Sequence, residues 1–407
     1  MARICFVRAW YFPIDVRVSR EVEALVRAGH EVDVICARRS GEPAFERLGG
    51  VAVHRLPMAR RRAGLLRYLF EFIAFQVMAT LFTGFLHARR RFDVVQVNSL
   101  PDWLVFAAVI PKLLRTPVLL DLHECMPEYA ATVFHLRPSH PIVRVLGAIE
   151  QACIRFADLT FTCTEQMRER FIERGAPADR LGVVLNSFDE ERFQPLRQGA
   201  EETRPAVGRF VIVCHGTLDE NFGVDLVVRA VARLRNEIPG IRLEIYGDGK
   251  QRPALEALTR ELNCEDLVWL SRRIVPHPEL LPRLAAADMG VVAIRRDAFR
   301  DLTHCNKMYE LVALKKPVAI SRTRAVEAYF GEDCFEYFES GDDRDLARAI
   351  LTLYADPARR ERFVRRAFER AEPYRWVHQR ELYLGLVKRV LQPRQSEPTL
   401  AEAIGDR

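Results

Sequence analysis

The chain has 407 residues, of which 49% are hydrophobic and 29% are charged, and its formal net charge is +6. A chain of this length is expected to form two domains, and this balance of residue types excludes an intrinsically disordered protein. The modest positive charge suits anionic small molecules or an anionic membrane surface, and it gives no reason to expect a nucleic-acid partner.

The first half of the chain alternates short runs of β-branched residues with segments of helical periodicity. Helices are expected over 16–28 and 103–114, and strands over 3–7, 31–36, 51–55, 94–98, 118–122, 159–162 and 182–185. Such alternation predicts a doubly wound parallel sheet. No basic leader with a long apolar run precedes the first strand, so no signal peptide is expected.

A strongly apolar segment, 65–86, lies between arginine clusters at 60–62 and 89–91. Arg67 and Glu71 interrupt it and leave about fifteen uncharged residues, fewer than a membrane-spanning helix needs. The segment therefore has two interpretations. It is either a helix buried in the domain, or an apolar face with basic flanks that rests on the inner face of the plasma membrane.

A polar stretch, 194–207, predicts a linker, and a second alternating series follows it. A helix is expected over 224–236, and strands over 210–215, 242–246, 267–270, 290–294, 317–320 and 334–337. We therefore predict an α/β protein with two Rossmann-like doubly wound domains, 1–195 and 208–375, that face a central cleft. A C-terminal helix over 376–391 is expected to cross back to the first domain.

The nine cysteines are scattered singly from Cys5 to Cys334, without any C-x-x-C pair. Most lie in apolar runs, as Cys36 and Cys214 do. This pattern favours reduced, buried thiols in a cytoplasmic protein, and it predicts no metal site.

The segment 306–318 (NKMYELVALKKPV) predicts a short helix that leads directly into a strand. The unpaired N–H groups and the dipole at a helix N-terminus suit a diphosphate, and the Glu310 carboxylate can accept hydrogen bonds from a sugar diol. The alternative is an ordinary amphipathic helix capped by Asn306. The first interpretation predicts a nucleotide-sugar site.

Further motifs occur in a fixed order around this segment. In the second half they are His215-Gly216-Thr217-Leu218, Asn221-Phe222-Gly223-Val224-Asp225, Tyr246-Gly247-Asp248-Gly249, Leu284-Ala285-Ala286-Ala287-Asp288 and Lys316-Pro317-Val318. In the first half they are Asp15-Val16-Arg17-Val18-Ser19-Arg20, Gly29-His30-Glu31-Val32, Asp121-Leu122-His123-Glu124 and Asn186-Ser187-Phe188-Asp189. Over 4–391 this set resembles the retaining family 4 glycosyltransferases of the GT-B fold, in the branch that builds bacterial surface polysaccharides.

The resemblance implies transfer of a sugar from a nucleotide diphosphate sugar, with retained anomeric configuration and without a metal or other cofactor. UDP is the expected nucleotide on family frequency, and the expected acceptor is lipid-linked or a polysaccharide. The leaving diphosphate needs cationic groups or helix N–H donors, because negative charge develops there as the glycosidic bond breaks.

The resemblance also implies roles for individual residues. His123 matches the histidine beside the donor sugar, and Glu310 the glutamate that binds the ribose. The residues expected to bind the donor are Gly216, Thr217, Gly223, Gly247, Asn306 and Glu310, and those expected to close over donor or acceptor are Asp15, Arg17, Arg20 and Asn186. Each has a bland alternative: a structural histidine, a solvated carboxylate or helix face, turn glycines, or an Asx turn.

Several positions depart from the family pattern. Thr217 and Phe222 stand where the family has the arginine and lysine that hold the diphosphate, Leu302 replaces the first glutamate, and Lys315 replaces a glycine. Lys307, with His304 or His215, is then expected to stabilise the leaving group. A catalytically degenerate scaffold that binds nucleotide or glycan and a GT-B sugar-nucleotide epimerase remain as alternative functions. Lys112 and the arginines near Arg60 are interpreted as surface charge.

Overall fold

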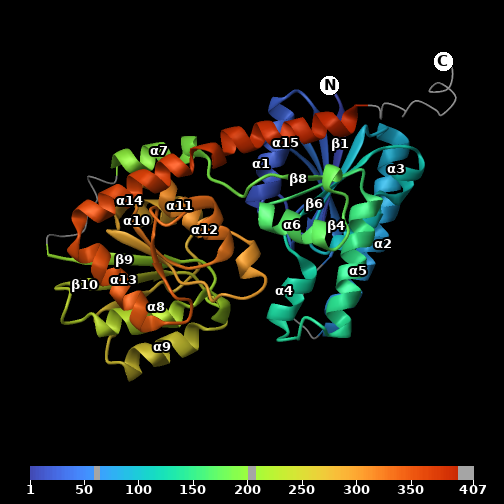
Figure 1. Ribbon diagram of the computed structural model, residues 1–407. Coiled ribbons are helices and arrows are strands. Elements are labelled where there is room, and N and C mark those ends of the chain that lie inside the picture. The colour runs from blue at the N-terminus through green and yellow to red at the C-terminus, as the bar shows by residue number, and fades with distance from the viewer. Residues whose placement is uncertain (59–64, 200–207, 393–407) are drawn as a thin grey trace, which may run out of the picture. The chain divides into compact units, whose positions relative to one another are not determined.

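The computed structural model describes residues 1–58, 65–199 and 208–392 (Figure 1). The chain divides into two compact units. The N-unit consists of Met1–Ala131, Leu136–Val184 and the chain from Arg380 onward, and the C-unit of Thr132–His135 and Leu185–Gln379. The arginine cluster at 60–62 lies outside the described residues.

The N-unit contains an eight-stranded sheet in the order β3-β4-β2-β1-β5-β6-β7-β8. The strands are β1 (Arg3–Arg8), β2 (Glu31–Arg38), β3 (Phe45–Leu48), β4 (Val51–Pro57), β5 (Val94–Asn98), β6 (Val118–Leu122), β7 (Leu159–Thr162) and β8 (Leu181–Val183). All neighbours pair in parallel except β3 and β4. The predicted doubly wound sheet is confirmed, with one antiparallel edge strand added.

That edge strand, β3, was not predicted. It is short and half polar, with the sequence FERL, and it joins β4 through Gly49 and Gly50. Both glycines have positive φ, 55° and 90°, as a tight hairpin turn requires. The Gly-Gly pair was therefore the available signal, but the four residues before it show too little apolar alternation to indicate a strand.

Helices cover the N-unit sheet (Figure 1). They are α1 (Val16–Arg27), α2 (Leu65–Arg90), the 3-10 helix η1 (Asp102–Ala108), α3 (Val109–Leu113), α4 (Met126–Val133), α5 (Pro141–Phe156), α6 (Glu165–Glu173) and the 3-10 helix η2 (Ala178–Arg180). The helix predicted over 103–114 is divided between η1 and α3. Pro111 lacks the N–H that would donate to the carbonyl of Ala107, so a regular α-helix cannot run through this point.

The apolar segment at 65–86 forms most of α2. On one face Phe72, Phe75, Ala79 and Leu86 are buried, and Gly84 packs so closely that a Cβ there would lie 2.6 Å from Ile110 Cδ1. Among the described residues, one helical stretch, Phe70–Arg90, is long and apolar enough to cross a membrane, with a mean hydropathy of 1.3. The prediction that this segment is too short to span a membrane was therefore too strict, although buried helices of soluble proteins also reach this length and composition.

The C-unit contains a six-stranded, fully parallel sheet in the order β11-β10-β9-β12-β13-β14. Its strands are β9 (Phe210–His215), β10 (Ile241–Tyr246), β11 (Val268–Leu270), β12 (Met289–Val292), β13 (Val318–Ser321) and β14 (Glu336–Phe338). Its helices are α7 (Glu190–Gly199), η3 (Glu220–Phe222), α8 (Val224–Arg233), α9 (Arg252–Glu261), α10 (His277–Ala286), η4 (Arg300–Leu302), α11 (Asn306–Ala313), α12 (Arg324–Phe330), α13 (Asp343–Ala355), α14 (Pro357–Arg370) and η5 (Glu372–Tyr374).

Part of the predicted linker is helical. The helix α7 runs from Glu190 to Gly199, although Pro195 lies inside it, and residues 200–207 lie outside the described part of the chain. Arg197 anchors this helix, because it pairs with Glu190 and donates to the carbonyl oxygen of Ala313 at 2.8 Å. Phe193 is buried as well. These tertiary contacts offset the proline, and polar composition alone did not reveal them.

The last helix, α15 (Trp376–Leu391), has the bounds predicted for the C-terminal helix. Its first residues belong to the C-unit, where Leu185 N–H donates to Gln379 Oε1 at 2.8 Å and Trp376 N–H to the Phe188 carbonyl at 2.9 Å. From Arg380 onward it belongs to the N-unit, where the buried Tyr383 hydroxyl donates to Gln96 Oε1 at 2.7 Å.

We expect Tyr383→Phe to lower the stability of the N-unit by about 1–2 kcal/mol, because it leaves the buried Gln96 oxygen without its donor. Amide hydrogen exchange of β5 and β7 measures this opening free energy within the N-unit. Tyr374→Phe is the matched control, since its hydroxyl makes only a 3.4 Å contact with Tyr329. Equal protection in the parent and in Tyr383→Phe would contradict the expectation.

Candidate functional site

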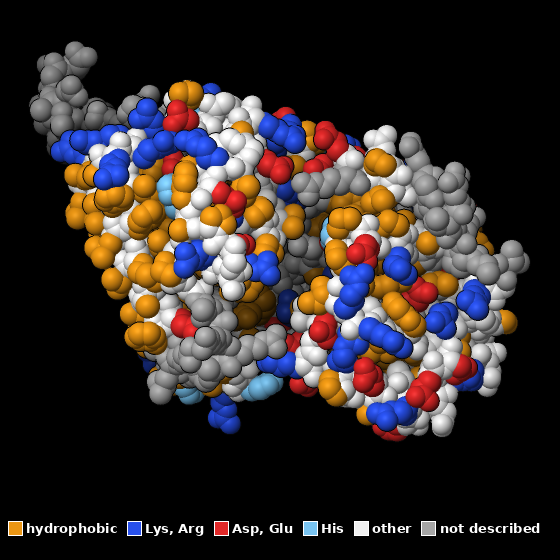
Figure 2. Space-filling view, turned by 180° about the vertical axis from the view of Figure 1, so that it is seen from behind, with side chains coloured by type: hydrophobic (Ala, Val, Ile, Leu, Met, Phe, Trp, Pro, Cys, Tyr) orange, Lys and Arg blue, Asp and Glu red, His pale blue; other side chains and the backbone are white. Residues whose placement is uncertain are grey.

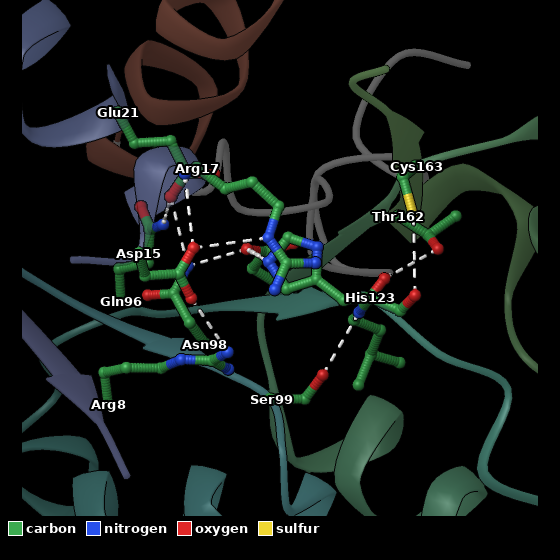
Figure 3. Close-up of polar contacts among 12 residues, drawn as sticks. Arg8, Asp15, Arg17, Glu21, Gln96, Asn98, Ser99, His123, Thr162 and Cys163 are labelled. Atoms are coloured by element: carbon green, nitrogen blue, oxygen red, sulfur yellow. Dashed lines mark hydrogen bonds and ion pairs between the residues drawn. The ribbon is translucent and has the colours of Figure 1, made fainter. Parts of the chain in front are cut away.

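In the N-unit, polar side chains gather where β1, β5, β6 and β7 end (Figure 3). The carboxyl ends of parallel strands meet at one edge of a sheet, and ligands of open α/β sheets bind at that edge. His123 follows β6 directly and is buried. The backbone N–H of His123 donates to Ser99 Oγ at 3.1 Å, and its backbone carbonyl oxygen accepts from Cys163 Sγ at 3.5 Å. The backbone on both sides of the ring is therefore fixed.

The His123 ring lies against Asp121. Its Nε2 is 2.6 Å from Asp121 Oδ2, off the line of an ideal hydrogen bond, and its Nδ1 has no hydrogen-bond partner among the described residues. Asp121 also accepts from Asn98 Nδ2 at 2.6 Å. The acidic partner thus sets the position of the ring and leaves one ring nitrogen available.

This contact belongs to a longer buried chain of polar groups. Asn98 Nδ2 donates to Glu21 Oε2 at 3.1 Å, and Gln96 Nε2 donates to the same oxygen at 2.7 Å (Figure 3). Burial raises the pKa of Glu21 well above its usual value, and the charge of Asp121 adds to that effect. Asn98 therefore links Glu21 to Asp121, the acidic residue beside the His123 ring.

Asp15 and Arg17 lie in the same region. Asp15 is the N-cap of α1 and accepts from Arg17 N at 3.2 Å and Arg17 Nε at 3.3 Å, while Arg8 Nη2 lies 3.0 Å from its other oxygen. Burial would raise the pKa of Asp15, but the charges of Arg17 and Arg8 lower it below its usual range. Arg20 is also buried, so the three side chains do not form the solvated helix face of the alternative interpretation.

In the C-unit, the predicted residues gather at the end of β9 and the start of α11. His215 Nε2 lies 2.7 Å from Glu310 Oε2, and His277 Nε2 lies 3.0 Å from Glu310 Oε1. Burial alone would raise the pKa of Glu310, but the two imidazole N–H donors lower it to about 2. Glu310 is therefore a carboxylate held by two histidines, and each oxygen keeps a second lone pair for a ligand.

We expect the free energy of unfolding to fall as the pH falls from about 5 to about 2. The folded pKa of Glu310 lies below the unfolded one of about 4.3, so its stabilisation is complete above that value and is lost below it. The effect is on the order of 3 kcal/mol. Unfolding of the parent and of Glu310→Gln, measured at several pH values, should give a difference that shrinks toward pH 2. A difference independent of pH would contradict this expectation.

Lys307 lies against the first glycine-containing loop. A Cβ on Gly216 would be 2.3 Å from Lys307 Cε and 2.9 Å from its Nζ, and that Nζ is 3.9 Å from the ring centroid of Phe222. Arg300 Cζ is 4.9 Å from the same ring. Phe222, which replaces the family's lysine, is therefore flanked by two cations. Sequence reasoning missed Arg300 because it lies in an irregular stretch without a motif.

Glycines hold these loops close together. Gly223 has φ +55°, and a Cβ there would lie 2.0 Å from the Ala293 carbonyl oxygen. A Cβ on Gly247 would lie 1.8 Å from the Gly216 carbonyl oxygen. The requirement for glycine at both positions comes from the protein's own backbone. Thr217, next to Gly216, is exposed.

The structure also places the other residues of the predicted donor site. The helix α11 begins at Asn306, but its N-cap is Cys305, which makes no side-chain cap hydrogen bond. The alternative of a helix capped by Asn306 is therefore wrong. His304 bonds the Ala325 carbonyl at 3.1 Å, and burial lowers its pKa to about 4. It is neutral at physiological pH, so it cannot assist Lys307 as a cation.

The remaining departures have local explanations. Leu302 is buried. The backbone at Lys315 is left-handed, with φ +54°, and this is the conformation that suits the glycine usual at that position in the family. Asn186 is half-buried after β8, within the C-unit. Lys112 pairs with Asp158 at 2.7 Å.

All nine cysteines are free thiols. Within the described ranges, no group of three or more His, Cys, Asp and Glu side chains lies close enough together to hold a metal ion.

Comparison with known families agrees with this arrangement. Residues 14–187 match the family described as "Glycosyl transferase 4-like domain" and residues 209–356 match "Glycosyl transferases group 1". The chain is 27% identical to a D-inositol 3-phosphate glycosyltransferase of Kineococcus radiotolerans, over 94% of this chain and 92% of that protein.

Two further proteins are informative. A GDP-mannose-dependent alpha-(1-6)-phosphatidylinositol monomannoside mannosyltransferase of Mycolicibacterium smegmatis is 28% identical over 50% of this chain and 54% of that protein. Sucrose-phosphate synthase from Thermosynechococcus elongatus has the same fold, with a TM-score of 0.74 and 20% identity over 96% of this chain and 99% of that chain. The chain thus belongs to the family 4 glycosyltransferases of the GT-B fold.

Proposed function

We propose that this glycosyltransferase is a retaining, metal-independent enzyme that uses a UDP-sugar and extends a lipid-linked or polysaccharide acceptor at the cytoplasmic membrane face. The observation that carries the proposal is the Glu310 carboxylate, held by His215 and His277 beside the cation of Lys307. Such an arrangement offers acceptors for a ribose diol and a cation for a diphosphate within one unit.

The chemistry assigned to these residues follows the charges of the reaction. As the bond from the anomeric carbon to the leaving oxygen breaks, the diphosphate takes the electron pair and its negative charge grows. Lys307, Arg300 and the uncapped N–H groups of α11 are proposed to stabilise that charge. In the N-unit, the available nitrogen of His123 is proposed to hold a hydroxyl of the donor sugar. This set needs no metal ion to neutralise the diphosphate.

Support for the acceptor and the nucleotide is of a different kind. The mycobacterial relative named above acts on a phosphatidylinositol mannoside, which supports a lipid-borne acceptor here. Its name specifies GDP-mannose, so GDP is the alternative to UDP. Departures at Thr217 and Phe222 favour one competing function, a degenerate protein that binds nucleotide or glycan without turnover.

Thermal-shift measurements with UDP, GDP and ADP, followed by a donor hydrolysis assay, test the proposal. Stabilisation by UDP together with slow hydrolysis of UDP-sugars is expected. Stabilisation by GDP alone would replace the nucleotide and keep the reaction. Binding without turnover on any donor and acceptor would favour the scaffold, and interconversion of sugars without an acceptor would favour the epimerase.

A further inference from the structure

The outward face of α2 is apolar from Phe70 to Phe85. Phe70, Ile73, Val77, Leu81 and Phe85 are between 47% and 70% exposed, and they follow one another at spacings of three or four residues. We call these five residues the α2 stripe. Because each residue adds 1.5 Å, the stripe runs for more than about 20 Å. A helix on the surface of a soluble domain normally turns polar residues outward, and this one does not.

The opposite face of α2 is part of the N-unit core. Phe75 and Ala79 are fully buried, and Gly84 is in close contact with Ile110. If α2 spanned a bilayer, it would lose these contacts and would expose the buried Thr83 and His87 to the hydrocarbon core of the bilayer. The helix therefore suits a position in the plane of an interface, with its core face retained and its stripe turned toward lipid.

Positive charge gathers at the C-terminal end of the stripe. Arg89 and Arg91 are exposed there, and the Arg89 guanidinium lies 4.2 Å from the ring centroid of Phe85. Arg115 is also exposed, and its neighbour Thr116 contacts His87 of α2 at 3.4 Å, which brings Arg115 to the same end. Such charges complement anionic lipid headgroups, each contributing about 1 kcal/mol near the surface.

Leucines extend this apolar surface beyond α2. Leu113 and Leu114, directly before Arg115, are 78% and 55% exposed at the end of α3, which packs on α2. Figure 2 shows hydrophobic side chains crowded along the flank of the N-unit on which α2 and α3 lie. An apolar patch of this extent, with basic residues at its edge, marks a contact surface on an otherwise soluble protein.

We propose that the α2 stripe and Arg89, Arg91 and Arg115 dock the N-unit peripherally on an anionic lipid bilayer, with α2 lying in the plane of the headgroups. The inference rests on the proposed function only in that a membrane-borne acceptor explains why docking is useful. The docking itself is a property of residues outside the candidate donor site.

The test is co-sedimentation of the full chain with vesicles of phosphatidylcholine, alone or mixed with phosphatidylglycerol. The parent is expected to bind the anionic vesicles and to be released by high salt. Val77→Ser with Leu81→Ser is expected to weaken binding at least about tenfold, or about 1.4 kcal/mol. Ile274→Ser with Leu382→Ser is the matched control, because those residues are 71% and 53% exposed and belong to neither α2 nor α3, and it should bind as the parent does.

A second variant, Arg89→Gln with Arg91→Gln and Arg115→Gln, tests the charges without touching the stripe. It should bind anionic vesicles at least about tenfold more weakly than the parent does. Circular dichroism and the thermal shift with nucleotide show whether each variant is folded. A variant that keeps the circular dichroism spectrum and the thermal shift of the parent but no longer binds vesicles supports docking, whether or not any nucleotide sugar is turned over.

Three results would overturn the proposal. Equal binding to neutral and anionic vesicles would remove the role of the arginines, and retention on vesicles after alkaline carbonate would indicate a spanning helix. The third result is a parent protein that does not bind vesicles but forms a dimer, with Val77→Ser and Leu81→Ser together dissociating that dimer. The stripe would then be a contact with a second copy of the chain. None of these results bears on nucleotide binding, so the proposed sugar transfer would stand or fall separately from the membrane position.

Discussion

Replacement of Lys307 by alanine is expected to lower kcat about 100-fold, because the leaving diphosphate loses a preorganised cation. The ammonium lies against Gly216 and over the Phe222 ring, within the unit that holds Glu310. Steady-state kinetics on the donor identified by thermal shift measures the effect. Since charge grows in the transition state, kcat should fall more than the affinity for the donor does.

Two further substitutions sharpen this result. Phe222→Leu removes the ring under the ammonium and is expected to reduce kcat about fivefold, since a cation–π contact contributes about 1 kcal/mol. Lys315→Ala is the matched control, because that lysine lies 4.7 Å from the Phe368 ring, away from Gly216. If Lys307→Ala keeps the turnover of the parent, Lys307 has no part in stabilising the leaving group.

Replacement of His123 by alanine is expected to lower kcat/KM by about 100-fold or more, because the donor sugar loses its positioned partner in the N-unit. The ring is buried and lies against Asp121, so its removal also leaves a buried carboxylate without its neighbour. Kinetics on the same donor measure the effect. His140→Ala is the control within the N-unit, because His140 caps α5 and lies outside the polar group of Figure 3.

Asp121→Asn separates positioning from contact. It keeps the shape of the side chain and removes the charge beside the ring, so kcat should fall about tenfold while KM changes little. An Asp121→Asn enzyme with the kcat of the parent would contradict the positioning role and leave His123 acting alone.

Most of the fold was predictable because it depends on local patterns of apolar and polar residues in the sequence. Buried parallel strands are continuous apolar runs, and four of them have the bounds predicted, namely 94–98, 118–122, 159–162 and 210–215. The exceptions depend on partners far along the chain. The strand β3 exists through its pairing with β4, and α7 through the contact of Arg197 with Ala313.

The candidate site was predictable where one segment carries its own signal. Glu310 was predicted from a helix start that suits a diphosphate, and Lys307 from the cations that the family resemblance implies and this chain lacks; the roles of both stay predictions. Arg300 and His277 could not be found in this way. They reach Phe222 and Glu310 from the first residues of η4 and α10, and their sequence neighbourhoods resemble ordinary surface. His304 was predicted as a helper, and only its burial showed that it is neutral.

The double membership of α15 has a consequence for how the chain is made. Apart from Thr132–His135, the C-unit is the continuous stretch Leu185–Gln379, which is inserted between Val184 and Arg380 of the N-unit. During synthesis the C-unit can fold while the N-unit still lacks Tyr383 and the rest of α15. The unit that begins first is then finished last, and any chain that stops early releases an incomplete N-unit. The hydrogen bond from Leu185 N–H to Gln379 Oε1 joins the first and last residues of this insertion, so its start and its end lie side by side.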